Sequence, residues 1–335
     1  MKLPTPKWWY VRAGAPAPVT RALLTPISWI WAWATARRLA RAVPVDPGIP
    51  VICVGNLTAG GTGKTPVVRE LLKLLRDRGI TAHGLSRGYG GRLRGPVRVD
   101  AEVHRAADVG DEPLMMAQDG PFWISADRAQ GACAAAAEGA QVVVMDDGHQ
   151  NPTLKKALSL VVVDGETRDG EWPLGDGAVF PAGPLREPLA VGLARADAVI
   201  LVLPADLPFP DPDLLAIFAG KPALVARITP VCPPPSGPQL GFAGIGKPWK
   251  FERALKAAGC HLVEFANFPD HATYSEDMLT RLADMAAHCG AGLITTEKDW
   301  VRLPSTWRGR IKAWPICVRF ETLADLDSLL SRLGL

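Results

Sequence analysis

Short apolar runs alternate with amphipathic segments along most of this chain. The run Val51–Val54 is followed by Pro66–Arg78, where apolar residues recur at the spacing of one helix face. Ala129–Glu138 also reads as a helix, and further runs of strand length lie at Ile80–Leu85, Gln141–Met145, Leu160–Asp164, Ala198–Leu203 and Ala223–Ile228. Strands that alternate with helices predict an α/β fold in which helices cover both faces of a mostly parallel sheet.

The proline-rich segment Pro230–Pro238 interrupts this pattern and indicates a domain boundary. A second, smaller α/β set follows, with strands expected at Leu240–Ala243, Gly292–Thr296 and Ile316–Phe320, and helices at Trp249–Ala258, Glu276–Ala287 and Ala324–Leu333. We therefore predict an N-terminal region over residues 1–45, a larger α/β domain over 46–228 and a smaller one over 229–335.

The first 50 residues differ from the rest in charge and aromatic content. They carry seven basic residues and one acid, a net charge of +6 in a chain whose total is +3, and five of the eleven tryptophans. Their apolar stretch, from about Leu23 to Ala36, ends at Arg37-Arg38 and is roughly 14 residues long, short of the ~20 that a membrane span requires. Basic flanks and tryptophans favour a helix in the membrane interface, and an ordinary helix packed on the domain is the plainer alternative.

Composition limits the class of protein. The chain has 335 residues and is 48% apolar, which is enough to build the cores of two domains. Its six cysteines are scattered, with no Cys-x-x-Cys pair and no Cys/His cluster, so neither a zinc site nor a disulfide framework is expected. This cysteine usage fits a reducing compartment. We expect no nucleic-acid partner.

The segment between Val51–Val54 and Pro66–Arg78 is rich in glycine and ends in Gly-Lys-Thr. A strand, such a loop and then a helix form the layout of a P-loop, in which backbone N–H groups and the positive end of the helix bind phosphates. We expect Lys64 to reach the β- and γ-phosphates and the Thr65 hydroxyl to bind Mg²⁺. The predicted nucleotide-binding residues are Thr58, Ala59, Gly60, Gly61, Thr62, Gly63, Lys64 and Thr65.

One position departs from the strict P-loop pattern. Thr58 stands where the pattern has its first glycine, and threonine lacks glycine's tolerance of positive φ. The pair Gly60-Gly61 can supply the turn instead. A glycine-rich turn that binds nothing is the alternative, but the agreement of strand, loop and helix favours a nucleotide site.

Acidic residues at two places are candidates for binding Mg²⁺. Asp146-Asp147 follows a buried strand, at the edge of the sheet where a P-loop also lies, and ordinary loop acids are the alternative. We predict a metal site of Thr65, Asp147 and Glu112, although the sequence leaves open which of Asp146 and Asp147 binds. Glu112 follows Asp111, and the two could equally be acids in the first turn of a helix.

Arg186 and His271 are less specific candidates. Arg186 lies in the rigid segment Pro181–Pro188, and arginine can stabilise the charge of a transferring phosphate, although an exposed, solvated arginine is equally expected. His271 follows Asp270 in the smaller domain. A lone histidine is more often structural than catalytic.

Eight segments stand in a characteristic order along the chain: Val54–Pro66, Leu85–Gly90, Val109–Pro113, Asp146–Gln150, Pro181–Pro188, Gly244–Pro248, Phe268–Tyr274 and Thr296–Asp299. Together they resemble the tetraacyldisaccharide 4′-kinase family, the lipid A 4′-kinases of Gram-negative bacteria. The resemblance covers most of the chain, including the basic N-terminal region.

The resemblance implies transfer of the γ-phosphate of ATP, with Mg²⁺, to the 4′-hydroxyl of a tetraacylated glucosamine disaccharide 1-phosphate, a lipid A precursor. It implies an active site between two α/β/α domains and an N-terminal helix at the cytoplasmic face of the bacterial inner membrane. In the family, the residues matching Asp111 and His271 act together to activate the acceptor hydroxyl. The expected catalytic residues are therefore Asp111, His271, Lys64 and Arg186.

The chain departs from the family pattern at two positions. His149 replaces a usual phenylalanine, and Ala272 replaces a frequent second histidine. The second change leaves His271 as the imidazole of its motif.

Two other functions compete with a lipid kinase. A membrane-associated switch ATPase or GTPase would bind protein partners, but a GTPase needs Asn-Lys-x-Asp, which Thr296–Asp299 matches only loosely, and a partitioning-type ATPase needs a lysine where Ala59 stands. A lipid-binding protein with a vestigial P-loop is the second alternative, and the intact Lys64, Thr65 and Asp147 argue against it.

Overall fold

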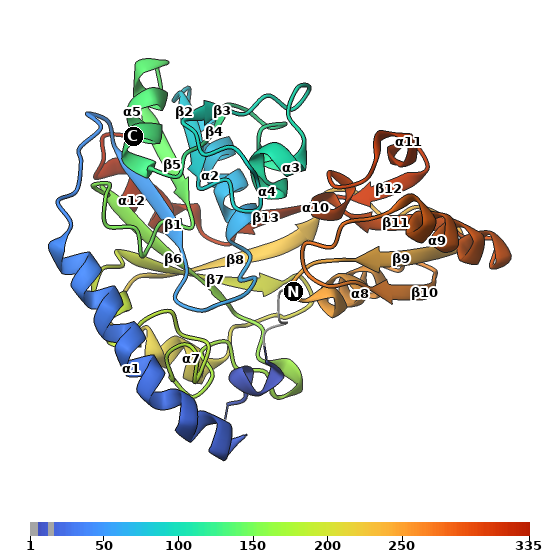
Figure 1. Ribbon diagram of the computed structural model, residues 1–335, viewed down its shortest axis with the longest axis horizontal. Helices are drawn as coiled ribbons and strands as arrows, with labels where there is room; N and C mark the ends of the chain where they lie inside the picture. The colour runs from blue at the N-terminus through green and yellow to red at the C-terminus, as the bar shows by residue number, and fades with distance from the viewer. Residues whose placement is uncertain (1–5, 13–16) are drawn as a thin grey trace.

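The computed structural model of the protein describes residues 6–12 and 17–335. A larger and a smaller β-sheet stand side by side, and helices flank each of them (Figure 1). A long helix, α1 (Pro18–Arg41), runs along the outside of the larger part. Lys2, one of the basic residues of the N-terminal region, lies outside the described residues.

Within the described residues the larger sheet has nine strands, in the order β13-β8-β7-β6-β1-β5-β2-β4-β3. All neighbours are parallel except the two edge pairs, β13 with β8 and β3 with β4. The strands are β1 (Val51–Gly55), β2 (Ala82–Ser86), β3 (Val97–Arg98), β4 (Phe122–Ile124), β5 (Val142–Asp146), β6 (Leu158–Asp164), β7 (Ala198–Pro204), β8 (Ala223–Pro230) and β13 (Ile316–Phe320).

Alternating side chains along these strands build a core on each face of the larger sheet. Ile52 and Val54 point to one face and pack with α2 and α12. Val51 and Cys53 point to the other and pack with α5, and α6 and α7 extend that second layer. The predicted mostly parallel sheet with helices on both faces is confirmed. The covering helices are α2 (Lys64–Asp77), α12 (Leu323–Ser331), α5 (Arg128–Ala137), α6 (Leu189–Ala194) and α7 (Pro212–Ile217).

The smaller sheet has four parallel strands in the described part of the chain, in the order β10-β9-β11-β12. Leu240 and Phe242 pack with α9 on one face, and Ala243 and Ile294 pack with α8 on the other. The elements are β9 (Gln239–Ala243), α8 (Pro248–Ala257), β10 (Leu262–Asn267), α9 (Glu276–His288), β11 (Gly292–Thr296) and β12 (Ile311–Trp314).

The C-terminal strand and helix do not belong with the smaller sheet, where the sequence placed them. β13 pairs antiparallel with β8, so that Val318 lies opposite Ile228, and α12 packs into the core beneath α2. The physical reason is burial: β13 covers the otherwise open edge of β8, and Leu326, Leu329 and Leu330 find an apolar face there. The chain therefore leaves the larger sheet after β8 and returns to it after β12.

Short helices connect the remaining strands. They are α3 (Ala106–Val109) and α4 (Asp111–Met116) between β3 and β4, and α10 (Glu297–Trp300) and α11 (Ser305–Arg308) between β11 and β12. The 3-10 turn η1 (Lys7–Tyr10) precedes α1, and the 3-10 turn η2 (Arg168–Gly170) lies between β6 and α6. Because α4 and α10 lie beside each other, they join the larger and the smaller part of the molecule.

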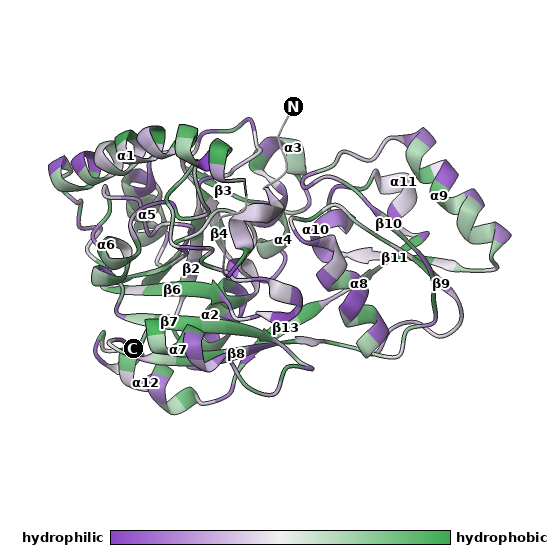
Figure 2. Cartoon of the chain, turned by 90° about the horizontal axis from the view of Figure 1, so that it is seen from below, coloured by the Kyte–Doolittle hydropathy of each residue, from purple (hydrophilic) through white to green (hydrophobic). Residues whose placement is uncertain are grey.

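Helix α1 buries two small polar residues, Ser28 and Thr35. Ser28 is buried and donates to the carbonyl of Val179 (2.8 Å), while Trp31 contacts the ring of Phe180. Several large apolar side chains of α1 are exposed, with exposed fractions of 72% for Leu23 and 69% for Trp29. Figure 2 shows α1 along the outside of the molecule, with hydrophobic residues at intervals along it. Within the described residues, no helix is both long and apolar enough to cross a membrane.

Candidate active site

The loop after β1 turns at two glycines. Gly60 and Gly63 adopt φ values of +93° and +83°, in the region that glycine tolerates, and α2 begins directly afterwards at Lys64. Thr58 forms an isolated antiparallel bridge with Leu185, an extended arrangement open to any residue. Threonine in place of the first glycine therefore does not strain the loop, because Gly60 supplies the turn.

This loop lies at the carboxyl edge of three neighbouring strands. β1 leads into it, and the strands on either side of β1 end at Asp146 and Asp164. Ligands of parallel α/β sheets bind at this edge. The first turn of α2 contains no acid, so the positive end of the helix and Lys64 together favour an anion at the loop.

Asp147 is held by two cations. Its Oδ1 accepts from Arg186 Nη1 at 2.7 Å and lies 3.6 Å from Lys64 Nζ. Burial opposes ionisation of Asp147, but the charges of Lys64 and Arg186 outweigh it and lower the pKa of this carboxyl. Asp147 is therefore a carboxylate whose Oδ1 is already paired with positive side chains of the nucleotide site.

Asp146 is in the opposite situation. Its side chain is buried, and within the described residues its Oδ1 has no hydrogen-bond partner. Burial, reinforced by the charge of Glu112, raises the pKa of Asp146 to about 7. A buried oxygen without a partner is costly, and a bound cation is one of the groups that relieves this cost.

Arg186 is tied to the P-loop through its backbone and its side chain. Its N–H donates to Leu57 O (2.8 Å) and its Nε donates to Thr58 O (3.2 Å). Its own carbonyl accepts from the indole N–H of Trp31 in α1 (2.9 Å). The predicted Arg186 is therefore brought to the P-loop, and the same residue connects the loop to the N-terminal helix.

Asp111 and His271 meet although they are 160 positions apart in the chain. Asp111 begins α4 in the larger part, and His271 lies in the loop before α9 with φ +59°. Their Oδ2 and Nδ1 atoms are 2.9 Å apart. Burial opposes the charge of Asp111, but the hydrogen bond from His271 and the charges of Lys298 and Arg302 outweigh it and lower its pKa. Asp111 is thus an ionised partner for the imidazole.

Glu112 follows Asp111 in the first turn of α4. Its Oε1 is 2.9 Å from Lys298 Nζ, so the residue predicted to bind metal is paired with a cation here. Its charge also acts on Asp146. Among the described residues, no group of three or more His, Cys, Asp or Glu side chains is arranged to hold a metal ion.

The smaller part of the molecule comes close to the P-loop at Gly246. A Cβ atom at Gly246, in the loop after β9, would lie 3.7 Å from the backbone nitrogen of Gly61 and 3.7 Å from Asp270 Oδ2. From the other side, the Tyr10 hydroxyl donates to Ala59 O at 2.5 Å. The residues predicted for phosphate binding and those predicted for proton transfer therefore line one region.

Three comparisons with known proteins agree. The sequence model of the family described as Tetraacyldisaccharide-1-P 4′-kinase matches residues 20–334. The chain belongs to this family. Proteins named tetraacyldisaccharide 4′-kinase from Caulobacter vibrioides (strain NA1000 / CB15N) and Phenylobacterium zucineum are 68% and 66% identical to it, over 100% and 99% of this chain and 100% of each relative. LpxK from Aquifex aeolicus, crystallised in complex with ATP, is 28% identical with a TM-score of 0.73, over 94% of this chain and 99% of its own.

Membership of the tetraacyldisaccharide 4′-kinase family confirms the resemblance read from the eight motifs. The two residues that depart from the family pattern, His149 and Ala272, both pack in or against a core. His149 is fully buried, with Nδ1 near Ser159 Oγ (3.1 Å) and Nε2 near Gly192 O (2.9 Å), and burial lowers its pKa to about 4. Ala272 packs against the core of the smaller sheet. The structure therefore gives His149 a structural place, despite its closeness in sequence to Asp147.

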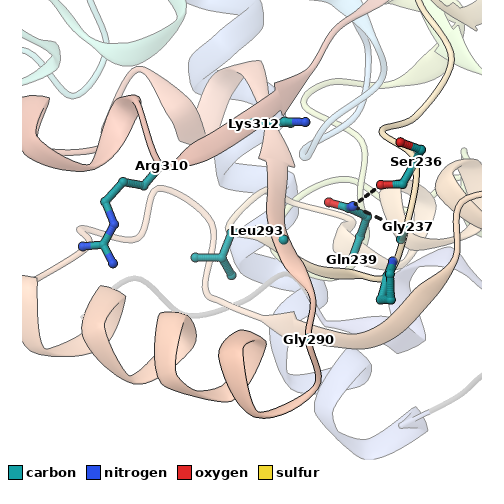
Figure 3. Close-up of a pocket in the computed structure, with 9 residues that line it drawn as sticks. Ser236, Gly237, Gln239, Gly290, Leu293, Arg310 and Lys312 are labelled. Atoms are coloured by element: carbon teal, nitrogen blue, oxygen red, sulfur yellow. Dashed lines mark hydrogen bonds between the residues drawn. The ribbon is translucent and has the colours of Figure 1, made fainter.

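One surface hollow lies away from the residues of this candidate active site. It has a volume of about 370 Å³ and is lined by Ser236, Gln239, Gly292, Arg310 and Lys312, among others (Figure 3). Gln239 and Gly292 are the first residues of β9 and β11, so the hollow sits at the amino edge of the smaller sheet. The chemistry expected of the family lies at the carboxyl edge of the larger one.

Sequence reasoning did not identify Arg302 and Lys298 as partners of the predicted residues. Arg302 Nε donates to Asp111 Oδ2 at 2.7 Å, and Lys298 contacts Glu112. The one local signal was the motif Thr296–Asp299, because its last residue, Asp299, lies one helical turn before Arg302. That spacing links Asp299 to Arg302 but carries no information about Asp111.

Proposed function

We propose that this protein transfers the γ-phosphate of ATP to the 4′-hydroxyl of a tetraacylated glucosamine disaccharide 1-phosphate in lipid A biosynthesis. The single observation that carries the proposal is the Asp111–His271 pair, which meets across two sheets beside a P-loop in a chain of this family. A switch ATPase does not activate an acceptor hydroxyl, so it has no need of an aspartate–histidine pair beside its P-loop.

The proposed proton transfer follows from the geometry of the pair. Ionised Asp111 accepts from Nδ1–H of His271, which leaves Nε2 as the nitrogen that can accept a proton. Asp270 Oδ2 lies 3.7 Å from Nε2. The acceptor hydroxyl gives its proton to Nε2 as its oxygen forms a bond to the γ-phosphorus. The bond from that phosphorus to the β–γ bridging oxygen breaks, and ADP leaves.

Positioning and charge neutralisation supply the rest of the proposed catalysis. Backbone N–H groups of residues 58–65 and the start of α2 cradle the phosphates. Lys64 and Arg186 offset the negative charge that the transferring group and the leaving group carry. In the structure both cations contact Asp147, which keeps them at the loop.

Mg²⁺ is the metal that this set of oxygen ligands fits. Thr65, Asp147 and Glu112 remain the predicted ligands, and hydroxyl and carboxylate oxygens suit a hard cation. The buried Asp146 Oδ1, which lacks a partner within the described residues, supports Asp146 as a further carboxylate that holds the ion or its water shell. When bound, Mg²⁺ neutralises charge on the β- and γ-phosphates.

We place the protein at the cytoplasmic face of the bacterial inner membrane, bound through α1. The outward apolar side chains of this helix include Val19, Leu23, Trp29 and Ile30, with exposed fractions of 65–72%, and Arg37, Arg38 and Arg41 follow. An apolar face with basic residues beside it is typical of interfacial binding. The helix contacts Arg186, so an acyl-chain-bearing substrate would reach the site from the same membrane surface.

The test is transfer of label from [γ-³²P]ATP to the disaccharide acceptor by the purified full-length chain in detergent micelles. We expect labelled lipid, and ATP consumption that depends on the acceptor. Acceptor-independent hydrolysis without labelled lipid would instead support the alternative, a membrane-associated switch ATPase that binds protein partners. An acceptor that lacks the 4′-hydroxyl serves as the matched control.

A further inference from the structure

Arg302 is an arginine buried between the two parts of the molecule, with only 7% of its side chain exposed. Its Nε donates to Asp111 Oδ2 at 2.7 Å, and its Nη1 donates to the carbonyl of Gly244 at 2.8 Å. Asp111 belongs to α4 beside the larger sheet, whereas Gly244 follows β9 of the smaller one. One guanidinium therefore bridges the two parts.

The Gly244 carbonyl also holds His271. It accepts from the backbone N–H of His271 at 3.1 Å. His271 has φ +59°, a conformation that a non-glycine residue adopts only where its surroundings impose it. Arg302 consequently contacts one member of the Asp111–His271 pair directly and fixes the backbone anchor of the other.

The guanidinium is in turn fixed by Asp299, which is fully buried. Asp299 Oδ1 accepts from Arg302 Nη1 (2.8 Å), from the Tyr274 hydroxyl (2.8 Å) and from the backbone N–H of Gly244 (3.1 Å). Asp299 Oδ2 accepts from the Thr296 hydroxyl (2.6 Å). The motif Thr296–Asp299 thus has a function in supporting Arg302.

We propose that Arg302, held by Asp299, is the positioning residue of the Asp111–His271 pair. It keeps the Asp111 carboxylate turned toward the imidazole and fixes the left-handed backbone of His271, without touching either substrate. A planar fork of N–H donors can do both at once, which a lysine cannot. This inference rests on the proposed function, because it assigns Arg302 to the same proton transfer.

The first experiment compares Arg302→Gln with Arg308→Gln in the full-length protein. Arg308 is the matched control, because it donates to the carbonyls of Leu303 and Val301 beside the same short helix but does not contact Asp111. We expect Arg302→Gln to lower kcat roughly 10²-fold, with both KM values within about 3-fold of wild type, as for loss of oriented general-base catalysis. A raised acceptor KM with unchanged kcat, or a loss equal to that of Arg308→Gln, overturns the proposal.

Combination with His271→Ala tests whether Arg302 acts through the pair. We expect Arg302→Gln to cost less than about 3-fold in kcat when His271 is already alanine, because residues that act as a unit are not additive. An equal loss in both backgrounds means that Arg302 acts elsewhere. If Arg302→Gln fails to fold, Asp299→Asn, which preserves the shape of the side chain, is tested by the same criteria. Arg302→Lys is expected to recover only part of the kcat lost in Arg302→Gln.

An NMR measurement separates this inference from the proposed function. The imidazole N–H proton of His271 that is bonded to Asp111 should give a low-field resonance in wild type, identified by its absence from His271→Ala. We expect Arg302→Gln to shift or broaden it, and an unchanged resonance overturns the positioning role whatever the turnover. Wild-type protein that transfers no phosphate would overturn the proposed function alone.

Discussion

The two halves of the candidate active site are built in different ways. The P-loop consists of consecutive residues between β1 and α2, and its partners Asp147 and Arg186 also come from the larger part. The Asp111–His271 pair joins residues 160 positions apart, one from each part of the molecule. The first half needs one folded sheet, whereas the second needs two sheets docked against each other.

Because of this difference, nucleotide binding should depend on the larger part alone, whereas the proposed proton transfer should depend on both parts. A phosphate cradle formed within one sheet can bind ATP however the smaller sheet sits. The proposed base, His271, is paired with Asp111 only when Gly246 and the His271 loop lie against the larger part, as they do here. Substitutions in the first half should therefore affect the phosphates directly, and those in the second should lower turnover with little effect on ATP affinity.

The largest effect is expected from Lys64→Ala. Loss of the cation at the β- and γ-phosphates should lower phosphoryl transfer roughly 10³-fold or more, while the melting temperature stays near wild type. The exposed Lys73 on the same helix, paired with Asp77, provides the control variant Lys73→Ala. Labelled-phosphate transfer and thermal unfolding are measured together, and near-wild-type transfer by Lys64→Ala would remove the basis for a P-loop kinase.

A smaller loss is expected from each member of the pair. Asp111→Asn and His271→Ala should each lower kcat roughly 10²-fold and leave the KM for ATP within about 3-fold, because general-base catalysis is lost and the phosphate cradle is not. The double variant should be little worse than the worse single one. His288→Ala, at an exposed histidine of α9, is the control. Fully additive losses would show that the two residues act separately.

A third test changes the outer face of α1 and leaves its inner contacts intact. Trp29→Ser combined with Trp33→Ser should weaken liposome binding and raise the acceptor KM roughly tenfold, with little change in the KM for ATP, because apolar area for the membrane is removed. Substitution is preferable to deletion, because Ser28 and Trp31 of the same helix bind the segment that carries Arg186.

Flotation at low and high salt separates the charge of the helix from its apolar face. The electrostatic part of binding should weaken at high salt in both wild type and variant. The apolar part should persist in wild type only. Equal flotation of the two proteins, with the same acceptor KM, would mean that α1 is an ordinary packed helix.

The smallest effect on activity is expected from His149→Phe, which should change kcat by less than about 3-fold. Its effect on stability should depend on pH. Burial lowers the pKa of His149 to about 4 from an ordinary value of 6.5, so the folded state excludes a proton that the unfolded chain binds. Wild type should therefore lose about 2–3 kcal/mol of stability through this residue as the pH falls from 7 to 4.5, and His149→Phe should not.

Urea unfolding at several pH values measures this difference. The raised pKa of Asp146, about 7, has the opposite sign and lowers stability as the pH rises, but it is present in both proteins and cancels in the comparison. Parallel stability curves for wild type and His149→Phe would contradict a buried neutral histidine. A large loss of kcat would place His149 in the site after all.

Local sequence carried much of the fold and of the nucleotide site. The apolar runs of β1 and β5 and the helical spacing of α2 predicted the central layers. Gly63 and Lys64 stand where the P-loop pattern requires them, and Gly60 supplies the turn that the pattern assigns to its first glycine. Edge elements were harder: β10 is partly exposed and has no clear apolar alternation, and β3 has only two residues. The placement of β13 was wrong, because an apolar run does not say which sheet edge it will cover.

What the sequence determined by itself is the chemistry that lies within a few consecutive residues, since strand, glycine turn and helix are specified by backbone preference and side-chain periodicity. Only the tertiary structure decided that Asp147 is paired with Arg186 while Asp146 Oδ1 lacks a partner among the described residues, and that Arg302 supports a pair drawn from two sheets. Those arrangements depend on contacts between residues far apart in the chain. Burial and the distances between charged groups decide these ion pairs and pKa values, and the spacing of residues along the sequence does not specify those distances.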